Sequence, residues 1–302
     1  RINDQIKAEN SNVRLAFETQ ESRIHDLCNE LAQTTQQLQE LQGKTGMYVT
    51  NLLEVQDQME ILAREGAFIS SARDANSVKM SAAQSGEDMI LEYIIGSLHR
   101  DPAKETYLDL GANHAKYLSN TYFFYKRGAR GVLVEANPSL IAELKFYRSG
   151  DVILNRCISD VSGQEMDFFI LTNDGLSTPD KKGAEAAMGE NTAVQLDKVV
   201  TVKSITVEEI FETYFDAAPT ILNLDIEGKE MEILNSIDFT KYRPLIMIIE
   251  TIPYRRHLVV GEKNDDVIEF MKSKNYTEYA FTGINSIFLD QEQVDKILEN
   301  WD

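Results

Sequence analysis

The residues best suited to chemistry in this sequence lie where runs of apolar residues end. Asp109 ends the first such run and Gly111 follows it. Glu135 ends the second run, and Asp225 and Glu227 follow a later one. A glycine at such a position lets the backbone approach a ligand closely, because no side chain intervenes. A carboxylate there can accept both hydroxyl hydrogens of a ribose, so these residue types indicate a nucleotide-like ligand beside a group of carboxylates.

Asp225 and Glu227 are two residues apart, so both side chains can point the same way from an extended segment. Together they can hold a cation, position an amine or deprotonate a hydroxyl group. With Glu250, at the end of another apolar run, they can ligate magnesium through oxygen atoms. The alternative is that Glu227 and Glu230 only favour the start of the next helix through its dipole, which leaves Asp225 unexplained.

Two histidines, His114 and His257, follow predicted strand ends and emerge on the ligand side. A hydroxyl group of a substrate needs a base or a metal to lose its proton, so both histidines are candidates for a catalytic base. Each can equally be a substrate contact or an ordinary surface residue. The sequence leaves a histidine base and a metal-assisted reaction both open.

A sheet must bring these motifs together, and residues 85–302 carry the pattern of one. Predicted strands are the apolar segments at 106–110, 131–135, 152–155, 220–224 and 244–250, with a closing antiparallel pair at 276–282 and 285–289. Predicted amphipathic helices cover 86–98, 117–126 and 265–274, and two others end near 148 and 237. Such alternation predicts an α/β fold with a parallel sheet covered on both faces. Ligands bind at the carboxyl ends of such strands, where the strand order switches.

Two polar segments near this edge are candidates for contact with an acceptor. Residues 172–191 are small, polar and long enough to form a lid or an acceptor loop, or a loop without function. Arg255 and Arg256 follow the strand that ends at Glu250, and their guanidinium groups can bind an acidic sugar or a phosphate. Surface solvation is the alternative for these arginines.

Residues 1–65 have a different pattern. With Ile24 at position a of a heptad, thirteen of the eighteen a and d positions are apolar. This seam predicts a coiled coil whose helix needs a partner, so we expect a homo-oligomer. The alternative is a helix that breaks at Gly43 and Gly46 and folds back on its own globular domain. Residues 66–84 are predicted to be a linker, and residues 85–302 one globular domain.

Composition excludes several classes of partner. The 302 residues include 49 acidic and 30 basic side chains, a formal charge of −19, whereas nucleic-acid binding needs clustered Lys and Arg. Cys28 and Cys157 cannot build a disulfide framework, which fits a reducing, cytoplasmic location. No apolar stretch reaches about 18 residues, so no membrane span is predicted. Because the sequence starts at Arg1 without a methionine, we expect that more chain precedes it.

Five ordered motifs resemble those of the FkbM-type S-adenosylmethionine-dependent methyltransferases. They are residues 107–113 (YLDLGAN), 134–138 (VEANP), 158–160 (ISD), 222–228 (LNLDIEG) and 248–250 (IIE). Their order and spacing match over about residues 84–290. Residues 84–88 (QSGED) and 119–122 (SNTY) resemble a bacterial subgroup of this family.

The resemblance implies a Rossmann-like class I methyltransferase sheet with helices on both faces, here preceded by a long α-helical coiled coil. It also implies S-adenosylmethionine as the cofactor. It places Asp109, Gly111 and Asn113 around the methionine part of the cofactor. Glu135 and Ala136 would lie at the ribose, and Asp160 with Ile158 would flank the adenine. Asp225 would face the reacting centre, and the residues that would contact the acceptor are Asn120, Arg255 and Glu250.

The family mostly methylates hydroxyl groups, often on sugars of glycans or natural products. The resemblance therefore implies an O-methyltransferase acting on a saccharide, for instance at the chain end of a bacterial surface polysaccharide. In that setting the coiled coil would link the domain to a glycosyltransferase module upstream, and hold it at the inner membrane through partners. The alternatives are a methyltransferase of a small natural product and an oligomerising scaffold that binds ligand without turnover.

Overall fold

The structure is a computed structural model of the chain, and it describes residues 79–252 and 263–299. Several sequence predictions concern other residues. The coiled coil at 1–65, the linker up to residue 78, Arg255 and His257 lie outside the described residues.

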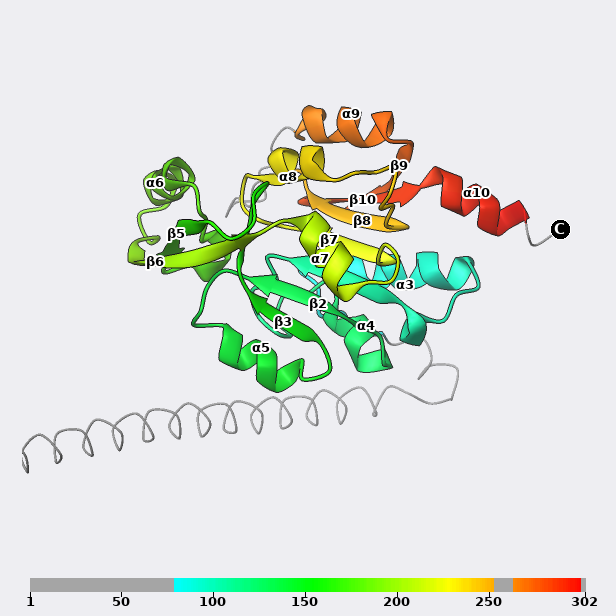
Figure 1. Cartoon of the computed structure of the whole chain (residues 1–302), viewed down its shortest axis with the longest axis horizontal. Helices are drawn as coiled ribbons and strands as arrows, with labels where there is room; N and C mark the ends of the chain where they lie inside the picture. Colours follow the sequence, from blue (N-terminus) through cyan, green and yellow to red (C-terminus); the bar gives the residue numbers. More distant parts are fainter. Residues whose placement is uncertain (1–78, 253–262, 300–302) are drawn as a thin grey trace, which may run out of the picture. The chain divides into compact units, whose positions relative to one another are not determined.

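A seven-stranded sheet has the strand order β3-β2-β1-β7-β8-β10-β9 (Figure 1). Its parallel strands are β1 (Thr106–Leu110), β2 (Arg130–Glu135), β3 (Val152–Asn155), β7 (Ile221–Leu224) and β8 (Ile246–Glu250). Strand β10 (Asn285–Asp290) is antiparallel both to β8 and to β9 (Tyr276–Phe281). The predicted strands and the closing antiparallel pair are therefore confirmed.

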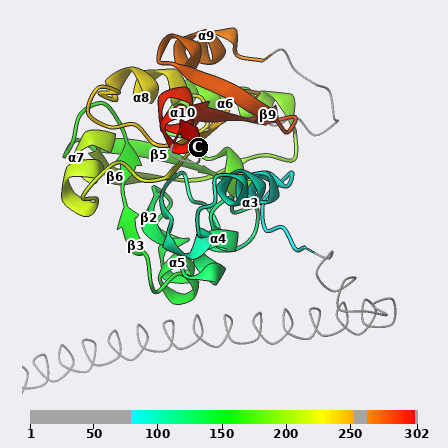
Figure 2. The same cartoon turned by 90° about the vertical axis from the view of Figure 1, so that its right-hand side faces the viewer.

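Helices cover both faces of this sheet, as the α/β prediction requires. One face packs against α7 (Val207–Tyr214), α8 (Glu230–Ser236) and α9 (Asp265–Ser273). The other packs against α3 (Glu87–Ser97), α4 (Tyr122–Arg127), α5 (Ile141–Tyr147) and α10 (Gln291–Glu299). Along β1, Tyr107 is buried on the α3 side and Leu108 on the α7 side, because successive side chains of a strand point to opposite faces. Figure 2 shows α7 and α3 on opposite sides of the strands.

A second, three-stranded sheet is missing from the sequence prediction. It consists of β4 (Cys157–Ile158), β6 (Leu196–Ile205) and β5 (Glu165–Leu171), in that order. Its strands contain both charged and β-branched residues. Only a small apolar cluster packs against this second sheet, so its strands do not need continuous apolar runs. The expected lid at residues 172–191 contains the short 3₁₀ helix η2 (Asp174–Leu176) and helix α6 (Lys181–Glu190).

The predicted helix at residues 117–126 is wrong in its first half, because α4 begins only at Tyr122. Leu118 has a φ of +58°, a left-handed conformation that a helix cannot contain. Leu118 also forms a β-bridge with Ala83. Residues 111–121 therefore form a long connection from β1 to α4. A second short 3₁₀ helix, η1 (Pro102–Lys104), precedes β1.

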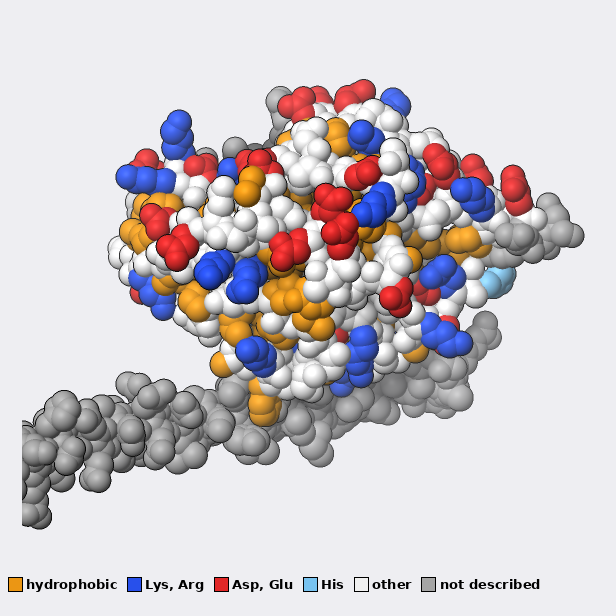
Figure 3. Space-filling model, in the orientation of Figure 1, with side chains coloured by type: hydrophobic (Ala, Val, Ile, Leu, Met, Phe, Trp, Pro, Cys, Tyr) orange, Lys and Arg blue, Asp and Glu red, His pale blue; other side chains and the backbone are white. Residues whose placement is uncertain are grey.

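Acidic and basic side chains are interspersed over the face of the described domain that Figure 3 shows. The longest helix among the described residues, α3, has 11 residues. Within the described ranges, no helix combines the length and the apolar character needed to cross a bilayer.

Candidate active site

The loops at the carboxyl ends of β1, β2, β7 and β8 enclose a cavity of about 560 Å³. Here the strand order reverses, since the chain moves outward from β1 to β3 and later places β7 on the other side of β1. Open α/β sheets bind ligands at such a switch point. The predicted site residues that line the cavity are Asp109, Gly111, Asn113, His114, Asn120, Glu135, Ala136, Asp225, Glu227 and Glu250.

Gly111 is where the loops after β1 and β7 meet. Its φ is +81°, and a Cβ atom there would collide with the backbone carbonyl oxygen of Asp225. Two backbone hydrogen bonds hold the segments in this position: the Gly111 amide donates to the carbonyl of Val134, and the Asp225 amide donates to the carbonyl of Leu110. The position of this glycine at the end of a strand predicts a close approach of the backbone to a ligand. The structure shows a close approach to the backbone that carries Asp225.

Asp109 forms part of the floor of the cavity. Its side chain is buried, and its two carboxylate oxygens accept hydrogen bonds from Thr121 Oγ1 at 2.6 Å and Asn223 Nδ2 at 2.9 Å. Burial raises the pKa of Asp109, while these two hydrogen bonds favour the ionised form. Through these two hydrogen bonds Asp109 organises the loop that carries Thr121 and the strand that carries Asn223.

Glu135 lies at the end of β2 with its carboxylate fixed by backbone amides. Oε2 accepts from Asn113 N at 2.8 Å and Oε1 from Asn137 N at 2.5 Å. Burial raises the pKa of Glu135 to about 7, although these two amide hydrogen bonds act in the opposite direction. Each oxygen keeps a lone pair, so the carboxylate can accept both hydroxyl hydrogens of a ribose.

Asn113 provides an independent test of whether this half of the cavity fits S-adenosylmethionine. Its Oδ1 is buried and has no hydrogen-bond partner among the described residues. A buried acceptor without a donor is costly, and the amino group of the methionine part can supply that donor. Since Asn113 also orients Glu135 through its backbone amide, the residues present fit the cofactor.

The neighbouring wall is apolar and suits a flat base. Ala136, Cys157, Ile158 and Phe168 line it, and burial raises the pKa of the Cys157 thiol to about 11, so this cysteine remains a neutral apolar contact. Asp160, expected beside the adenine, is exposed and is not among the described residues that line the cavity.

His114 lies between two carboxylates. Its Nδ1 is 3.0 Å from Glu143 Oε2, and its Nε2 is 3.0 Å from Asp174 Oδ2. The hydrogen bond to Glu143, with the charges of both acids, raises the pKa of His114. Because both ring nitrogens are engaged and the charged form is favoured, His114 in this arrangement fastens two segments and is not a free base.

Three carboxylates meet on the other side of the cavity, and we call Asp225, Glu227 and Glu250 the acidic cluster. One oxygen from each lies within 4.8 Å of the others. Burial raises the pKa of Asp225 to about 7, with the charges of Glu230 and Asp109 adding to the effect. Burial and Asp225 also raise the pKa of Glu227 well above its usual value.

Glu230 has a different role from the acidic cluster. Its Oε1 accepts the amides of Ile226 at 3.2 Å and Gly228 at 3.1 Å, at the start of α8. The explanation that Glu227 and Glu230 both serve the helix start therefore holds for Glu230. Glu227 has a φ of +58° and lines the cavity.

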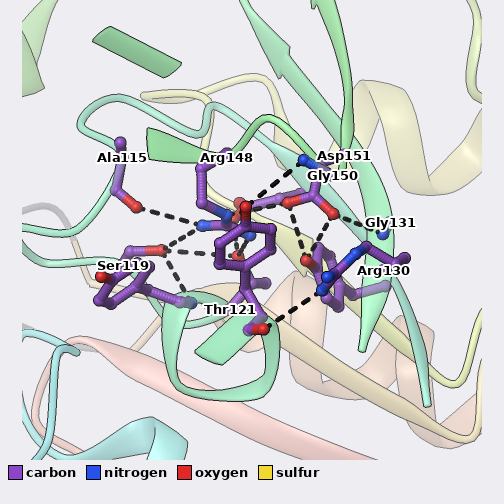
Figure 4. Close-up of polar contacts among 12 residues, drawn as sticks. Ala115, Ser119, Thr121, Arg130, Gly131, Arg148, Gly150 and Asp151 are labelled. Atoms are coloured by element: carbon purple, nitrogen blue, oxygen red, sulfur yellow. Dashed lines mark hydrogen bonds and ion pairs between the residues drawn. The ribbon is translucent and has the colours of Figure 1, made fainter. Parts of the chain in front are cut away.

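Arg148 is a residue that the sequence argument missed. Its side chain is fully buried and pairs with Asp151 at 2.9 Å (Figure 4). It also donates to the carbonyl of Ala115 at 3.2 Å and to Thr121 Oγ1 at 3.0 Å. Thr121 in turn donates to Asp109, so Arg148 connects the loop after β1 to the floor of the cavity. No pattern marks it, since an arginine at the end of an amphipathic helix usually faces solvent.

That loop carries Asn120, which the sequence assigns to the acceptor. Asn120 is 5% exposed and lines the cavity. Its Nδ2 donates to Asn223 Oδ1 at 2.9 Å, and its own Oδ1 has no partner among the described residues. Asn223 lies two residues before Asp225, so Asn120 contacts the strand that leads to the acidic cluster, and both line the same cavity.

Comparison with known proteins agrees with this geometry. The Methyltransferase FkbM domain matches residues 109–278. No match was found among curated proteins.

Solved methyltransferase structures are similar at low identity. A putative caffeoyl-CoA O-methyltransferase from Staphylococcus aureus is 13% identical, covering 80% of this chain and 97% of that chain, with a TM-score of 0.39. The 1,6-didemethyltoxoflavin-N1-methyltransferase from Burkholderia thailandensis, with S-adenosylhomocysteine bound, is 12% identical. The match covers 77% of this chain and 88% of that chain, with a TM-score of 0.36. Fibrillarin from Aeropyrum pernix, with natively bound S-adenosylmethionine, is 11% identical. The match covers 66% of this chain and 73% of that chain, with a TM-score of 0.33.

The family match extends over more than half of the 302 residues and includes the ends of β1, β2, β7 and β8. Glu135 and Asn113 present the acceptors that the cofactor needs. The chain therefore belongs to the FkbM methyltransferase family, and its cofactor is S-adenosylmethionine.

Proposed function

We propose that this methyltransferase acts on a hydroxyl oxygen of a saccharide. The observation that carries the proposal is the acidic cluster, which forms a wall of hydrogen-bond acceptors in the cavity. Neighbouring hydroxyl groups of a sugar are donors, so they complement this wall. Asn120 Oδ1 adds a further acceptor without a partner among the described residues.

The strand order separates this wall from the cofactor's ribose. Glu135 ends β2 and Glu250 ends β8, and β1 and β7 lie between them. Three inter-strand spacings of about 4.8 Å make roughly 14 Å. The cavity therefore has room for the nucleoside at one end and an acceptor at the other, with Asp225 between them.

When bound, S-adenosylmethionine supplies a methyl group on a positively charged sulfur. The chain's residues position the reactants, since in-line transfer depends mainly on alignment. Glu135 and Asn113 would hold the cofactor, whose methyl group would pass to the acceptor oxygen with the carbon–sulfur electron pair left on sulfur, and the hydroxyl proton would leave toward the acidic cluster. His114, held between Glu143 and Asp174, is not available for that proton.

The test is transfer of a labelled methyl group from S-adenosylmethionine to a panel of glycans, sugars, polyketides and amines, with S-adenosylhomocysteine binding measured separately by calorimetry. We expect a sugar methyl ether, identified by mass spectrometry and NMR. Asp225→Asn should abolish transfer while cofactor binding persists. Exposed Glu232→Gln is the matched control. Methylation of polyketides or amines alone would contradict the saccharide proposal.

Our proposal includes self-association through residues 1–65, for which the heptad seam is the support. Leu31→Asp places a charge at a core a position and should yield monomers in analytical ultracentrifugation. If the chain is a scaffold, Leu31→Asp would abolish its biological activity, and Asp225→Asn would leave it intact. The opposite result is expected of an enzyme. Chain-end methylation of a bacterial surface polysaccharide, beside a glycosyltransferase module, is the setting that we propose.

A further inference from the structure

Two carboxylates of the acidic cluster, Asp225 and Glu227, lack the hydrogen-bond donors that normally accompany buried carboxylates. Asp225 and Glu227 are half-buried, and no described residue donates a hydrogen bond to either side-chain carboxylate. Asp109, Glu135 and Glu230 differ, because each of them accepts two hydrogen bonds from described residues. Ionised carboxylates at such short range repel each other, and either a shared proton or a bound cation relieves that repulsion.

The basic side chains that line the described part of the cavity are engaged elsewhere. Lys229 Nζ contacts Glu232 at 2.7 Å. Arg156 donates to the backbone carbonyl of Asn155, and His114 lies between two carboxylates outside the acidic cluster. Among these three, none offers its charge to Asp225 or Glu227.

A second observation comes from Asn120. Its nitrogen donates to Asn223 Oδ1 at 2.9 Å, and the residue lines the cavity. The side chain is 5% exposed, and Oδ1 has no donor among the described residues. An amide oxygen beside carboxylates worsens their repulsion unless a cation is present. Amide and carboxylate oxygens are together the ligands that hard divalent cations prefer.

Asn285 repeats this arrangement next to Glu250. It lies directly opposite Glu250 in the ladder between β8 and β10, is 2% exposed, and its Oδ1 also lacks a donor among the described residues. Its Nδ2 donates to Glu87 at 3.0 Å, which fixes the orientation of the amide. Two buried amide oxygens without donors therefore accompany the acidic cluster.

We propose that Asp225, Glu227 and Glu250 hold a divalent cation of the magnesium or manganese class, with Asn120 Oδ1 as a neutral oxygen beside it. Such ions accept six oxygen ligands and retain open positions when three come from protein. This inference rests on the proposed function for its second half: two neighbouring hydroxyl oxygens of the saccharide occupy the open positions. The cation lowers the pKa of the coordinated hydroxyl, whose proton then leaves to a cluster carboxylate as the new carbon–oxygen bond forms.

Manganese binding to the full chain, measured by calorimetry and electron paramagnetic resonance with MnCl₂ alone, tests the site. We expect one ion per chain. Asp225→Asn and Glu227→Gln should each weaken binding at least about tenfold, since even outer-shell changes have effects of that size. Glu232→Gln, which removes an exposed acid nearby, should leave manganese affinity unchanged. Glu135→Gln should keep manganese and lose S-adenosylhomocysteine, which separates the two sites.

Each outcome decides one part of the proposal. Equal manganese affinity in the wild type and both cluster variants would mean an adventitious ion only, and would overturn the site. Unchanged methylation of a saccharide after chelation would overturn the cation while the proposed function stands. Specific manganese binding without methylation of any saccharide would support the site and overturn the acceptor class. If Asp225→Asn no longer binds S-adenosylhomocysteine, Glu227→Gln carries the test.

Discussion

His114 Nε2 lies 3.0 Å from Asp174 Oδ2 and connects the loop after β1 to the η2 segment, both of which line the cavity. Glu143 fixes the other ring nitrogen at 3.0 Å. A second contact holds the same segment, because Thr178 Oγ1 donates to the backbone carbonyl of Glu227 at 3.3 Å. The connection from β5 to α6 is therefore tied to the loops after both β1 and β7.

The His114 contact should depend on pH. The pKa of His114 is raised above its ordinary value of 6.5, so its stabilisation is complete below about pH 6.5 and is lost as pH rises through the raised folded value. We expect hydrogen exchange of residues 172–180, corrected for the intrinsic rate, to increase with pH. His114→Gln should remove this dependence at a cost below about 1 kcal/mol, because the three side chains are partly exposed. His99→Gln is the control. Equal hydrogen-exchange protection of residues 172–180 below pH 6.5 and above the raised folded pKa would contradict the prediction.

Glu135 should make cofactor binding depend on pH in the opposite direction. Its pKa is raised to about 7, so the carboxylate that we expect to accept the ribose hydroxyls forms mainly above neutrality. We expect S-adenosylhomocysteine to bind roughly tenfold more tightly at pH 8 than at pH 6, following the ionised fraction. Glu135→Gln should bind weakly at both values. A wild-type affinity that does not change with pH would rule out this role.

Glu135 also predicts a trend in stability. Between its ordinary pKa of 4.5 and its folded value of about 7, the folded state retains a proton that the unfolded chain releases. The free energy of unfolding contributed by this group therefore falls as pH rises through that window. Denaturant unfolding of the wild type and Glu135→Gln at several pH values checks this. The variant should show a smaller fall.

Gly111→Ala should damage both stability and cofactor binding. Gly111 and Gly163 have similar φ values of +81° and +78°, but an added Cβ meets Asp225 only at Gly111 and nothing within 4 Å at Gly163. The left-handed conformation costs alanine about 1–2 kcal/mol at either position. We expect Gly163→Ala to show that loss alone in denaturant unfolding. Gly111→Ala should lose more and bind S-adenosylhomocysteine poorly, whereas equal effects would show that the loops can separate without consequence.

Arg148→Met should cost about 3–5 kcal/mol, because it leaves the buried Asp151 without its ion-pair partner. The loss of the hydrogen bonds to Ala115 and Thr121 should also weaken S-adenosylhomocysteine binding. Adding Asp151→Asn should recover part of the stability. Lys241→Met, at an exposed ion pair with Glu212, is the control, and denaturant unfolding gives the comparison. A similar loss in both single variants would argue against a special role for Arg148.

The apolar runs of the sequence are sufficient to predict the central sheet and the polar residues at its edge. Strands β1, β2, β3, β7 and β8 are buried on both faces, so their nearly continuous apolar runs are readable without a structure. Asp109, Glu135, Asp225 and Glu250 follow from the ends of those runs. The period-2 alternation of strands and the switch in strand order then bring them to one edge.

The contacts of each of these groups could not be predicted from the sequence, because they depend on how distant segments pack. Sequence spacing does not show that Gly111 faces the backbone of Asp225, or that His114 lies between Glu143 and Asp174, because these partners come from distant loops. The second sheet was missed because its strands bury too little apolar surface to leave a clear pattern. Arg148 is buried because other elements close over it, and such long-range packing leaves no local signal in the chain.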